Sequence, residues 1–509
     1  MSVETNHNAA VDRETGFVRE LGLFDSVMIT VGIMIGSGIF IVPADMARNI
    51  GSAGWLLVAW GVAAVLTVAA ALSYGELASM MPRAGGVYVY LREAFSPIVG
   101  FLFGWTLFTV IQTGTIAAVA VAFARFTGVL WPAIAEDRYL IAPIHLSNGY
   151  AISLSTGQLT AIVVIALLTW TNSRGVRYGK IVQNLFTTAK VAALIALILC
   201  GLIFSQHEAI AANFTNLWMP HDVTPITASL SALTAAGLFV AICVSQSGSL
   251  FAADSWHDIT FASGEVRDPQ RTVPRALAIG TVCVLGLYLL ANVAYLLVLP
   301  LHAIQHAPAD RVATAMLQVL FPGWGAALMA IAIMVSTFGC INGLVLAGPR
   351  VCYSMAQDGL FPKKAGELNA QRVPGWSLLI QGIWAAALVL PRTYNPQTHA
   401  YGSLYSNLLD YIISAALLFY ALTIAAVFRL RIKRPGAARP YRAVGYPIVP
   451  IVYIAGATAI LVCLFLFRPA TTWPGLLIVA IGVPVYFLRG KLWGGLPDRK
   501  SIADRLRLE

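Results

Sequence analysis

Long apolar stretches, separated by short polar ones, follow one another along most of the chain. Twelve of these stretches are close to or above the about 20 residues that an α-helix needs to cross a bilayer. They cover residues 23–48, 54–80, 97–129, 157–172, 181–205, 228–260, 275–299, 324–356, 376–391, 404–429, 448–467 and 473–489. The pattern predicts an all-α integral membrane protein with twelve transmembrane helices.

The composition agrees with this pattern. Hydrophobic residues make up 58% of the 509 positions and charged residues only 11%, whereas soluble domains carry roughly 25% charged residues. A chain this poor in charge cannot cover a water-facing surface, so most of it must face lipid. The first 20 residues are polar and lack an apolar core, so they are not a signal peptide. We expect them, and residues 490–509, to form cytoplasmic tails.

The formal net charge is +10, which alone could suggest a nucleic-acid partner. The distribution of the charge favours membrane topology instead. With the first tail inside, the predicted outside segments hold only Arg48, Arg138, Arg311, Arg392 and Arg468. The predicted inside segments hold many more basic residues, including six between positions 429 and 442. This asymmetry follows the positive-inside rule and predicts an even number of spans, two cytoplasmic termini and no nucleic-acid partner.

Two of the twelve runs are interrupted by small and polar residues. The first contains Gly36-Ser37-Gly38, and the sixth contains Ser245-Gln246-Ser247-Gly248-Ser249 followed by Asp254-Ser255. If these runs head equivalent halves of five spans each, the second half is inverted in the membrane. Matched interrupted spans of this kind indicate a transporter binding site. We therefore divide the chain into repeat 1 (21–205), repeat 2 (206–430) and helices 11 and 12 (431–489).

The glycines of the first run suit an opened helix. Each costs about 1 kcal/mol in a helix interior relative to alanine, and Gly32, Gly36 and Gly38 lie within seven residues. Opening frees N–H groups that, with the helix dipole, suit a carboxylate. The carbonyls upstream, near Ile33 and Met34, suit an ammonium group. Close helix packing through small residues is the alternative explanation.

Ionisable residues inside the predicted spans are further candidates, because they are costly there and often functional. Asp254 and Asp258 lie deep in the sixth run, unless the cytoplasmic end of the helix falls here and both are hydrated. Lys190 lies about ten residues into the fifth run, too deep to reach the interface easily. Its expected acceptors are the opened carbonyls of helix 1 and the hydroxyls of Ser336 and Thr337 in helix 8. A purely structural lysine is the alternative.

Other motifs add little chemistry. The six cysteines lie in or beside apolar runs and show no disulfide or metal-ligand spacing. There is no Walker A sequence and no converging catalytic motif, so we expect no enzyme activity, cofactor or metal ion. Glu76, near the end of the second run, is expected to pair with the nearby Arg83 at the membrane interface.

Several segments together resemble one known group of proteins. Gly36-Ser37-Gly38-Ile39-Phe40 resembles the helix 1 signature of the amino acid–polyamine–organocation (APC) superfamily. Similar matches run from Ser73 to Leu77 and Pro82 to Tyr90, from Gly175 to Lys190, and from Phe338 to Arg350 and Gln357 to Pro362. They span about residues 20–365, and the branch they most resemble is that of the L-type amino acid transporters and their bacterial relatives.

The resemblance implies a five-plus-five inverted repeat with discontinuous helices 1 and 6, working by alternating access. It implies that Ser37 and Gly38 hold the substrate carboxylate, and Gly36 belongs to the same predicted substrate site. Carbonyls near Ile33, Met34, Phe251, Ala252 and Asp254 would accept from the amine, Phe251 would be an aromatic gate, and Trp256 and Asn342 would lie near the site. Lys190 would replace the sodium ion of sodium-coupled relatives and tie helix 5 to helices 1 and 8.

Two departures from the family pattern matter. The family usually has an aromatic–small–Gly-Trp pattern in helix 6, whereas here Asp254-Ser255 precedes Trp256. A carboxylate there could contact a substrate amine or cation, or take a proton. Residues 130–155 contain no cysteine, whereas heteromeric eukaryotic members use one in this loop to bind a glycoprotein. We therefore expect no disulfide-linked glycoprotein subunit.

These features predict a cell-membrane transporter of L-amino acids, neutral ones first, that works without sodium. Proton symport and amino acid exchange are both open mechanisms. Cationic amino acids or polyamines are the second choice of substrate, because of Asp254. The alternative from another functional class of protein is a nutrient receptor, which binds an amino acid without transporting it. The expected partners are thus an amino acid, protons and the lipid bilayer.

Overall fold

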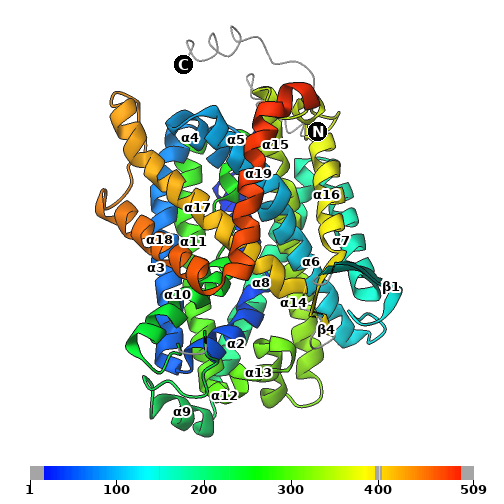
Figure 1. Cartoon of the computed structure of the whole chain (residues 1–509), viewed down its shortest axis with the longest axis vertical. Helices are drawn as coiled ribbons and strands as arrows, with labels where there is room; N and C mark the ends of the chain where they lie inside the picture. Colours follow the sequence, from blue (N-terminus) through cyan, green and yellow to red (C-terminus); the bar gives the residue numbers. More distant parts are fainter. Residues whose placement is uncertain (1–16, 148–149, 228–229, 396–399, 402–403, 494–509) are drawn as a thin grey trace, which may run out of the picture.

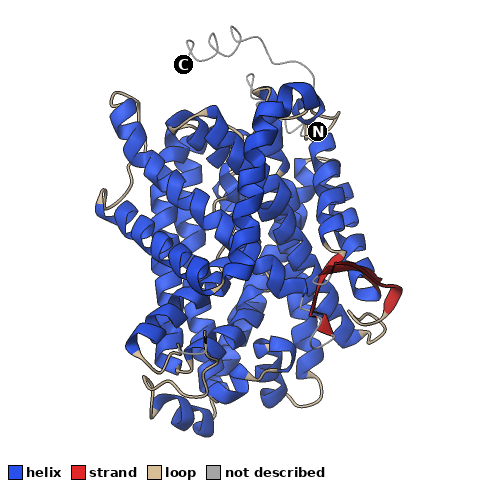
Figure 2. Ribbon diagram, viewed as in Figure 1, coloured by secondary structure: helices blue, strands red, loops and turns tan. Residues whose placement is uncertain are grey.

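Helices make up most of the molecule (Figure 2). A computed structural model describes residues 17–147, 150–227, 230–395, 400–401 and 404–493. The predicted tails at 1–20 and 490–509 therefore lie almost entirely outside the described residues.

Each of the twelve apolar runs corresponds to helix. The bounds, in chain order, are α1 (Leu23–Met34) and α2 (Gly38–Ile50), α3 (Ala53–Met80), α5 (Pro97–Thr106) and α6 (Gln112–Leu130), α7 (Thr156–Ser173), α8 (Val176–Ile203), α10 (Ala235–Ala252), α11 (Pro269–Val298), α14 (Gly325–Ala347) and α15 (Pro349–Gln357), α16 (Gly375–Leu388), α17 (Leu404–Lys433), α18 (Ile448–Phe467) and α19 (Pro469–Trp493). Shorter helices are α4 (Val87–Ala94), α9 (His207–Phe214), α12 (Leu301–Gln305) and α13 (Val312–Leu320).

The length and apolar composition of the helices indicate a multi-pass membrane protein. Among the described residues, nine helical segments are long and apolar enough to cross a membrane, and α1 with α2 makes a tenth span across a 41° bend. The helices α7 and α16 lie on the predicted runs 157–172 and 376–391, but α16 has only 14 residues and neither meets the same criterion. The span count of twelve, like the inverted repeat, stays a prediction.

Polar side chains define where several of these helices begin. The hydroxyl of Ser52 accepts from the Trp55 N–H at the start of α3, at 3.3 Å. Thr234 does the same for the Gly237 N–H at the start of α10, at 3.1 Å. Such caps satisfy N–H groups that the helix itself leaves without acceptors. Gly51 ends α2 with a φ of 68°, a conformation that glycine adopts without strain.

The third span has an internal irregularity that the hydrophobic pattern does not reveal. A π-helical segment, η1 (Leu107–Ile111), separates α5 from α6. Single π-turns of this kind are rare and often occur at functional sites. The residue directly after it, Gln112, is buried and points a side-chain amide into the helix bundle.

A small sheet corrects the all-α expectation. Strands β1 (Tyr139–Ser147), β2 (Tyr150–Ser155), β3 (Pro391–Asn395) and β4 (Ala400–Tyr401) pair antiparallel in that order. Figure 2 shows them at one edge of the helical body. The sequence pattern predicts a loop at 130–155, whereas residues 139–147 and 150–155 form an antiparallel hairpin whose second strand pairs with β3, more than 200 residues further along the chain.

The segments predicted to lie on the same side of the membrane meet in the structure. Lys180 donates to the Glu20 carbonyl, and Ser354 donates to the Ala84 carbonyl. At the other end of the bundle, Arg48 of α2 pairs with Asp310 at 2.6 Å. The labels of α4, α5 and α15 lie at one end of the molecule and those of α9, α12 and α13 at the other (Figure 1). These polar segments thus gather at two opposite ends of the helix bundle.

The expected Glu76–Arg83 pair is wrong. The buried Glu76 carboxylate instead accepts from Arg431 of α17 at 2.9 and 2.6 Å, and from the Ala443 N–H at 2.7 Å. Arg439 lies 3.3 Å away. Nearness in sequence favoured Arg83, but that side chain is exposed, and the partners of Glu76 come from more than 350 residues away.

Candidate functional site

The first helical break lies in the predicted place. Helix α1 ends at Met34 and α2 begins at Gly38, so Ile35, Gly36 and Ser37 form the connection. All three are buried. A break at this depth leaves carbonyl groups without helical partners, and inside a membrane such groups must be satisfied by neighbouring side chains.

Lys190 of α8 donates hydrogen bonds to two of these carbonyl groups. Its ammonium donates to the Gly32 carbonyl at 2.6 Å and to the Ile35 carbonyl at 2.8 Å. The side chain is 1% exposed, so the charge is neutralised by carbonyl dipoles rather than by water. Gly339 lets α8 pack closely against α14, because a Cβ there would lie 2.8 Å from the Phe186 Cβ and 3.3 Å from the Lys190 ammonium nitrogen.

Helix α14 holds the same break from another side. Ser336 donates to the Ile35 carbonyl at 3.0 Å and to the Gly36 carbonyl at 3.2 Å. The Cys340 thiol donates to the Ile33 carbonyl at 3.0 Å. Thr337, however, donates to the Ile333 and Met334 carbonyls of its own helix. Ser336 is therefore a second donor to the break and not an acceptor for Lys190.

The second break begins only after the first part of the predicted interruption, because Ser245–Ser249 is continuous helix within α10. The run extends to residue 260, but α10 ends at Ala252, and turns and a 3-10 helix, η2 (Asp258–Thr260), follow it. Ser255 has a φ of 63°, which a helix cannot accommodate. The apolar composition of this stretch reflects burial inside the bundle, because residues 251–266 are all buried.

The two breaks touch each other. A Cβ on Gly38 would lie 2.6 Å from the Ala252 Cβ and 2.7 Å from its Cα. The Tyr288 hydroxyl of α11 lies 2.9 Å from the Met34 carbonyl and 3.0 Å from the Ala252 carbonyl. One side chain thus bridges the last carbonyl of α1 and the last carbonyl of α10.

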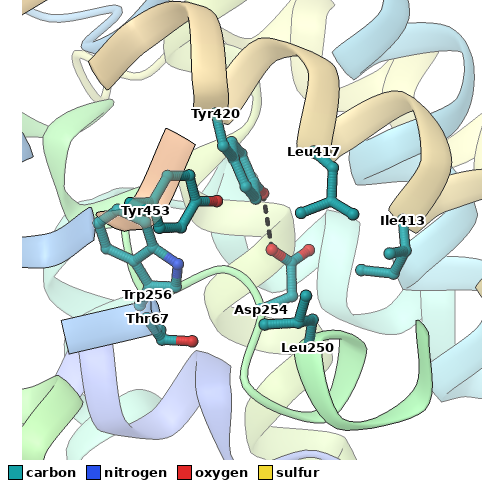
Figure 3. Close-up of a pocket in the computed structure, with 8 residues that line it drawn as sticks. All are labelled: Thr67, Leu250, Asp254, Trp256, Ile413, Leu417, Tyr420 and Tyr453. Atoms are coloured by element: carbon teal, nitrogen blue, oxygen red, sulfur yellow. Dashed lines mark hydrogen bonds between the residues drawn. The ribbon is translucent and has the colours of Figure 1, made fainter. Parts of the chain in front are cut away.

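A small pocket lies beside the second break. It is lined by Thr67, Leu250, Asp254, Trp256, Ile413, Leu417, Tyr420 and Tyr453. Figure 3 shows the Asp254 carboxylate pointing at the Tyr420 hydroxyl, which donates to Asp254 Oδ1 at 2.6 Å. Asp254 Oδ2 is buried and has no hydrogen-bond partner among the described residues.

A sequence model of a known family covers nearly the whole of this architecture. The model, described as amino acid permease, matches residues 21–487. The chain belongs to the amino acid permease family. The predicted superfamily, and with it the prediction of an amino acid transporter in the cell membrane, is confirmed.

Individual relatives of this permease extend over almost all of it. The serine/threonine exchanger SteT of Bacillus subtilis is 28% identical over 490 residues, which are 96% of this chain and 99% of that protein. The b(0,+)-type amino acid transporter 1 of Homo sapiens is 30% identical, covering 94% and 89%. The human large neutral amino acids transporter small subunit 2 is 30% identical, covering 96% and 83%.

Asn342 has a different environment from the two breaks. In this permease its Nδ2 donates to the Gly179 carbonyl at 3.1 Å and to Gln183 Oε1 at 3.0 Å, while its Oδ1 accepts from Asn172 at 2.9 Å. These contacts join α14 to α7 and α8. Phe251 and Trp256, in contrast, lie in the buried segment around the second break.

Four residues at the candidate site escaped sequence reasoning: Gln112, Tyr288, Cys340 and Tyr420. Gln112 donates to Asp258 Oδ2 at 3.1 Å and to the Leu344 carbonyl at 2.9 Å. Each is a hydrogen-bonding side chain inside an apolar run, which is the available signal. Because tyrosine and glutamine are also common in packed helices, that signal alone does not identify a site.

Proposed function

We propose that this permease is a secondary active transporter that moves L-amino acids by alternating access, without sodium, and prefers neutral side chains. The observation that carries the proposal is the Lys190 ammonium, which donates to the Gly32 and Ile35 carbonyls at the first break. A protein cation held there makes a bound metal cation unnecessary. The relatives SteT and the large neutral amino acids transporter small subunit 2 support an amino acid substrate.

The substrate site we propose lies between the two breaks. The N–H groups of Ser37 and Gly38 would bind the substrate carboxylate at the start of α2, where the helix dipole is favourable, while the Gly36 N–H donates to the Met34 carbonyl at 2.9 Å. The carbonyls at Ile33, Met34, Phe251 and Ala252 would accept from the amine. Tyr288 already bonds two of these carbonyls, so it would hold both half-helices at the spacing that the substrate requires. Trp256 and Asp254 would border the side-chain end.

The proposal includes the twelve-span plan with a five-plus-five inverted repeat and both termini in the cytoplasm. Repeat 1 (21–205) begins with the broken pair α1–α2, and repeat 2 (206–430) begins with the span that breaks after α10. Lys190, Ser336 and Cys340 act at the first break. By its contacts, Asn342 belongs to the scaffold behind it, as does Thr337.

One observation favours a second substrate class. The Asp254 Oδ2 atom, buried and without a hydrogen-bond partner among the described residues, would attract the extra positive charge of a cationic amino acid or polyamine. Against this, Asp254 Oδ1 accepts from Tyr420, which already stabilises the carboxylate.

A competition assay in proteoliposomes distinguishes these substrates. The purified permease is reconstituted with an internal pool of unlabelled amino acids, and saturable uptake of a radiolabelled L-amino acid mixture is measured against single competitors. We expect alanine, serine or leucine to compete better than arginine or putrescine. If arginine or putrescine competes best, the neutral preference is wrong; if substrate binds but never enters the lumen, the protein is a receptor and not a transporter.

A further inference from the structure

Two neighbouring ionisable residues follow the second break and take no part in the proposed amino acid site. His257 and Asp258 are each 1% exposed; His257 directly precedes the 3-10 helix η2, and Asp258 is its first residue. His257 Nε2 lies 3.7 Å from Asp258 Oδ1. The net charge of a histidine and a carboxylate at this distance depends on how many protons the two side chains hold together.

The imidazole of His257 has no hydrogen-bond partner among the described residues at either ring nitrogen. Its surroundings are aromatic: the rings of Tyr420, Trp256, Phe261 and Tyr74 lie 4.8, 5.2, 5.3 and 5.9 Å from it. A buried polar nitrogen that is left without a partner costs free energy, so a purely structural role explains this residue poorly. The orphaned nitrogens point to a ligand that the helix bundle itself does not supply.

The Asp258 carboxylate accepts a hydrogen bond from one neutral side chain, that of Gln112. Gln112 donates to its Oδ2 at 3.1 Å and is itself fixed by the Leu344 carbonyl. In the described part of the chain, no lysine or arginine forms an ion pair with Asp258. The only basic side chain within 4 Å of its carboxylate there is His257.

The other titratable groups around the pair come from several helices. They are Tyr74 of α3, Tyr90 of α4 beside Thr260, Tyr288 of α11, Cys340 of α14, Tyr420 of α17 and Tyr453 of α18, with Asp254 four residues earlier and Lys190 of α8 at the first break. The tyrosines and the cysteine are neutral at physiological pH. The Lys190 charge is directed at the Gly32 and Ile35 carbonyls, so it does not neutralise Asp258.

We propose that the His257–Asp258 pair binds the proton that this permease couples to amino acid movement. With one proton, the pair is either a neutral acid beside a neutral imidazole or an imidazolium beside a carboxylate, and both forms have no net charge. Without that proton, a carboxylate would remain buried with no cation beside it, which is strongly unfavourable. The enclosed pair therefore holds a proton and releases it when either aqueous side opens to the segment.

The coupling to the substrate follows from connectivity. The segment 253–257 joins the pair to Ala252, whose carbonyl accepts from Tyr288 at the contact of the two breaks. Gln112 ties Asp258 to α6 and α14. A movement that opens the substrate site must therefore also move the pair. This inference rests on the proposed transport function, and it adds that a proton gradient drives the amino acid in the same direction as the proton.

Two measurements on the purified permease test the proton site. Counterflow of a radiolabelled L-amino acid mixture at equal pH reports exchange, and accumulation into vesicles with an alkaline lumen reports proton coupling. We expect Asp258→Asn and His257→Gln to lower accumulation at least tenfold while counterflow continues. Asp137→Asn, which removes an exposed carboxylate elsewhere, should accumulate as the wild type does.

The wild type gives a test that needs no variant. Amino acid entry should acidify the lumen, as a trapped pH-sensitive dye reports, and a protonophore should abolish accumulation. Net amino acid entry without acidification of the lumen in the wild type would overturn the proton site, while counterflow would show that the transport function is intact. Unchanged accumulation by both variants would also overturn it. An absence of counterflow in the wild type would overturn the transport function itself.

Discussion

The ammonium nitrogen of Lys190 lies 2.6 Å from the carbonyl oxygen of Gly32. The same nitrogen lies 2.8 Å from the Ile35 carbonyl, one residue before the glycine that opens the helix. A lysine from the fifth predicted span thus stabilises the carbonyls that the break in the first span leaves free. Charge-assisted hydrogen bonds of this kind are stronger than neutral ones, so this contact is central to the proposed mechanism.

Replacing Lys190 with alanine should remove most transport. The substitution leaves the buried Gly32 carbonyl without its side-chain donor and the Ile35 carbonyl with Ser336 alone, and an unsatisfied buried group costs about 1–3 kcal/mol. We expect at least a tenfold loss of uptake in proteoliposomes, with normal membrane insertion measured by fluorescence size-exclusion chromatography. The control is Thr188→Ala on the same helix, because Thr188 is exposed and bonds only within α8. Equal uptake by both variants would remove Lys190 from the mechanism.

Replacing Gly38 with alanine should separate the two breaks. The added Cβ would lie 2.7 Å from a backbone atom of Ala252, so a half-helix must shift, at about 1–3 kcal/mol for an overpacked site. We expect at least a tenfold loss of substrate affinity in a binding assay. Gly61→Ala is the matched control, since a Cβ on Gly61 of α3 meets nothing within 4 Å. Wild-type affinity in Gly38→Ala would show that the contact is not part of the site.

The Tyr420–Asp254 hydrogen bond should show energetic coupling. Tyr420 donates to a buried carboxylate, and hydrogen bonds to charged groups contribute about 1.5–3 kcal/mol. Tyr420→Phe should therefore lower thermal stability in detergent more in the wild type than in an Asp254→Asn background. The double-mutant cycle measures this difference directly. Additive effects of the two substitutions would mean that the bond contributes nothing in the membrane protein.

Glu76→Gln should destabilise the contact between α3 and α17. The Glu76 carboxylate is 1% exposed and accepts from Arg431 and from the Ala443 N–H. Removing one partner of a buried ion pair costs about 3–5 kcal/mol, although Arg431 is partly exposed and the loss should fall at the lower end. A melting curve checks this, with Glu367→Gln, an exposed glutamate, as the matched control. An unchanged melting temperature would contradict the anchoring role.

Sequence reasoning located the helices because lipid imposes a strong rule: a span must be apolar over its whole length. It also located the break at Gly36 and the buried Lys190, because glycine and lysine are costly in the middle of such a run. In the sixth run the interruption predicted at Asp254-Ser255 lies directly after the end of α10, but the part predicted at Ser245–Ser249 is helical, since Ser249 finds an acceptor in Gln246 of the same helix.

Long-range partners could not be predicted either. Glu76 pairs with Arg431. Strand β2 pairs with β3, although the helices from α7 to α16 lie between the two strands in the sequence. A single sequence records no distance between such positions. Tyr288 and Tyr420 were missed for a related reason: a tyrosine in an apolar run packs equally well with or without a partner for its hydroxyl.

The dependence of uptake on sodium tests the central claim most directly. The wild-type permease in proteoliposomes is given radiolabelled L-amino acids in sodium buffer and in buffer where choline replaces sodium. Because Lys190 supplies the cation at the break, we predict equal initial rates in the two buffers. Uptake that strictly requires sodium would contradict the account.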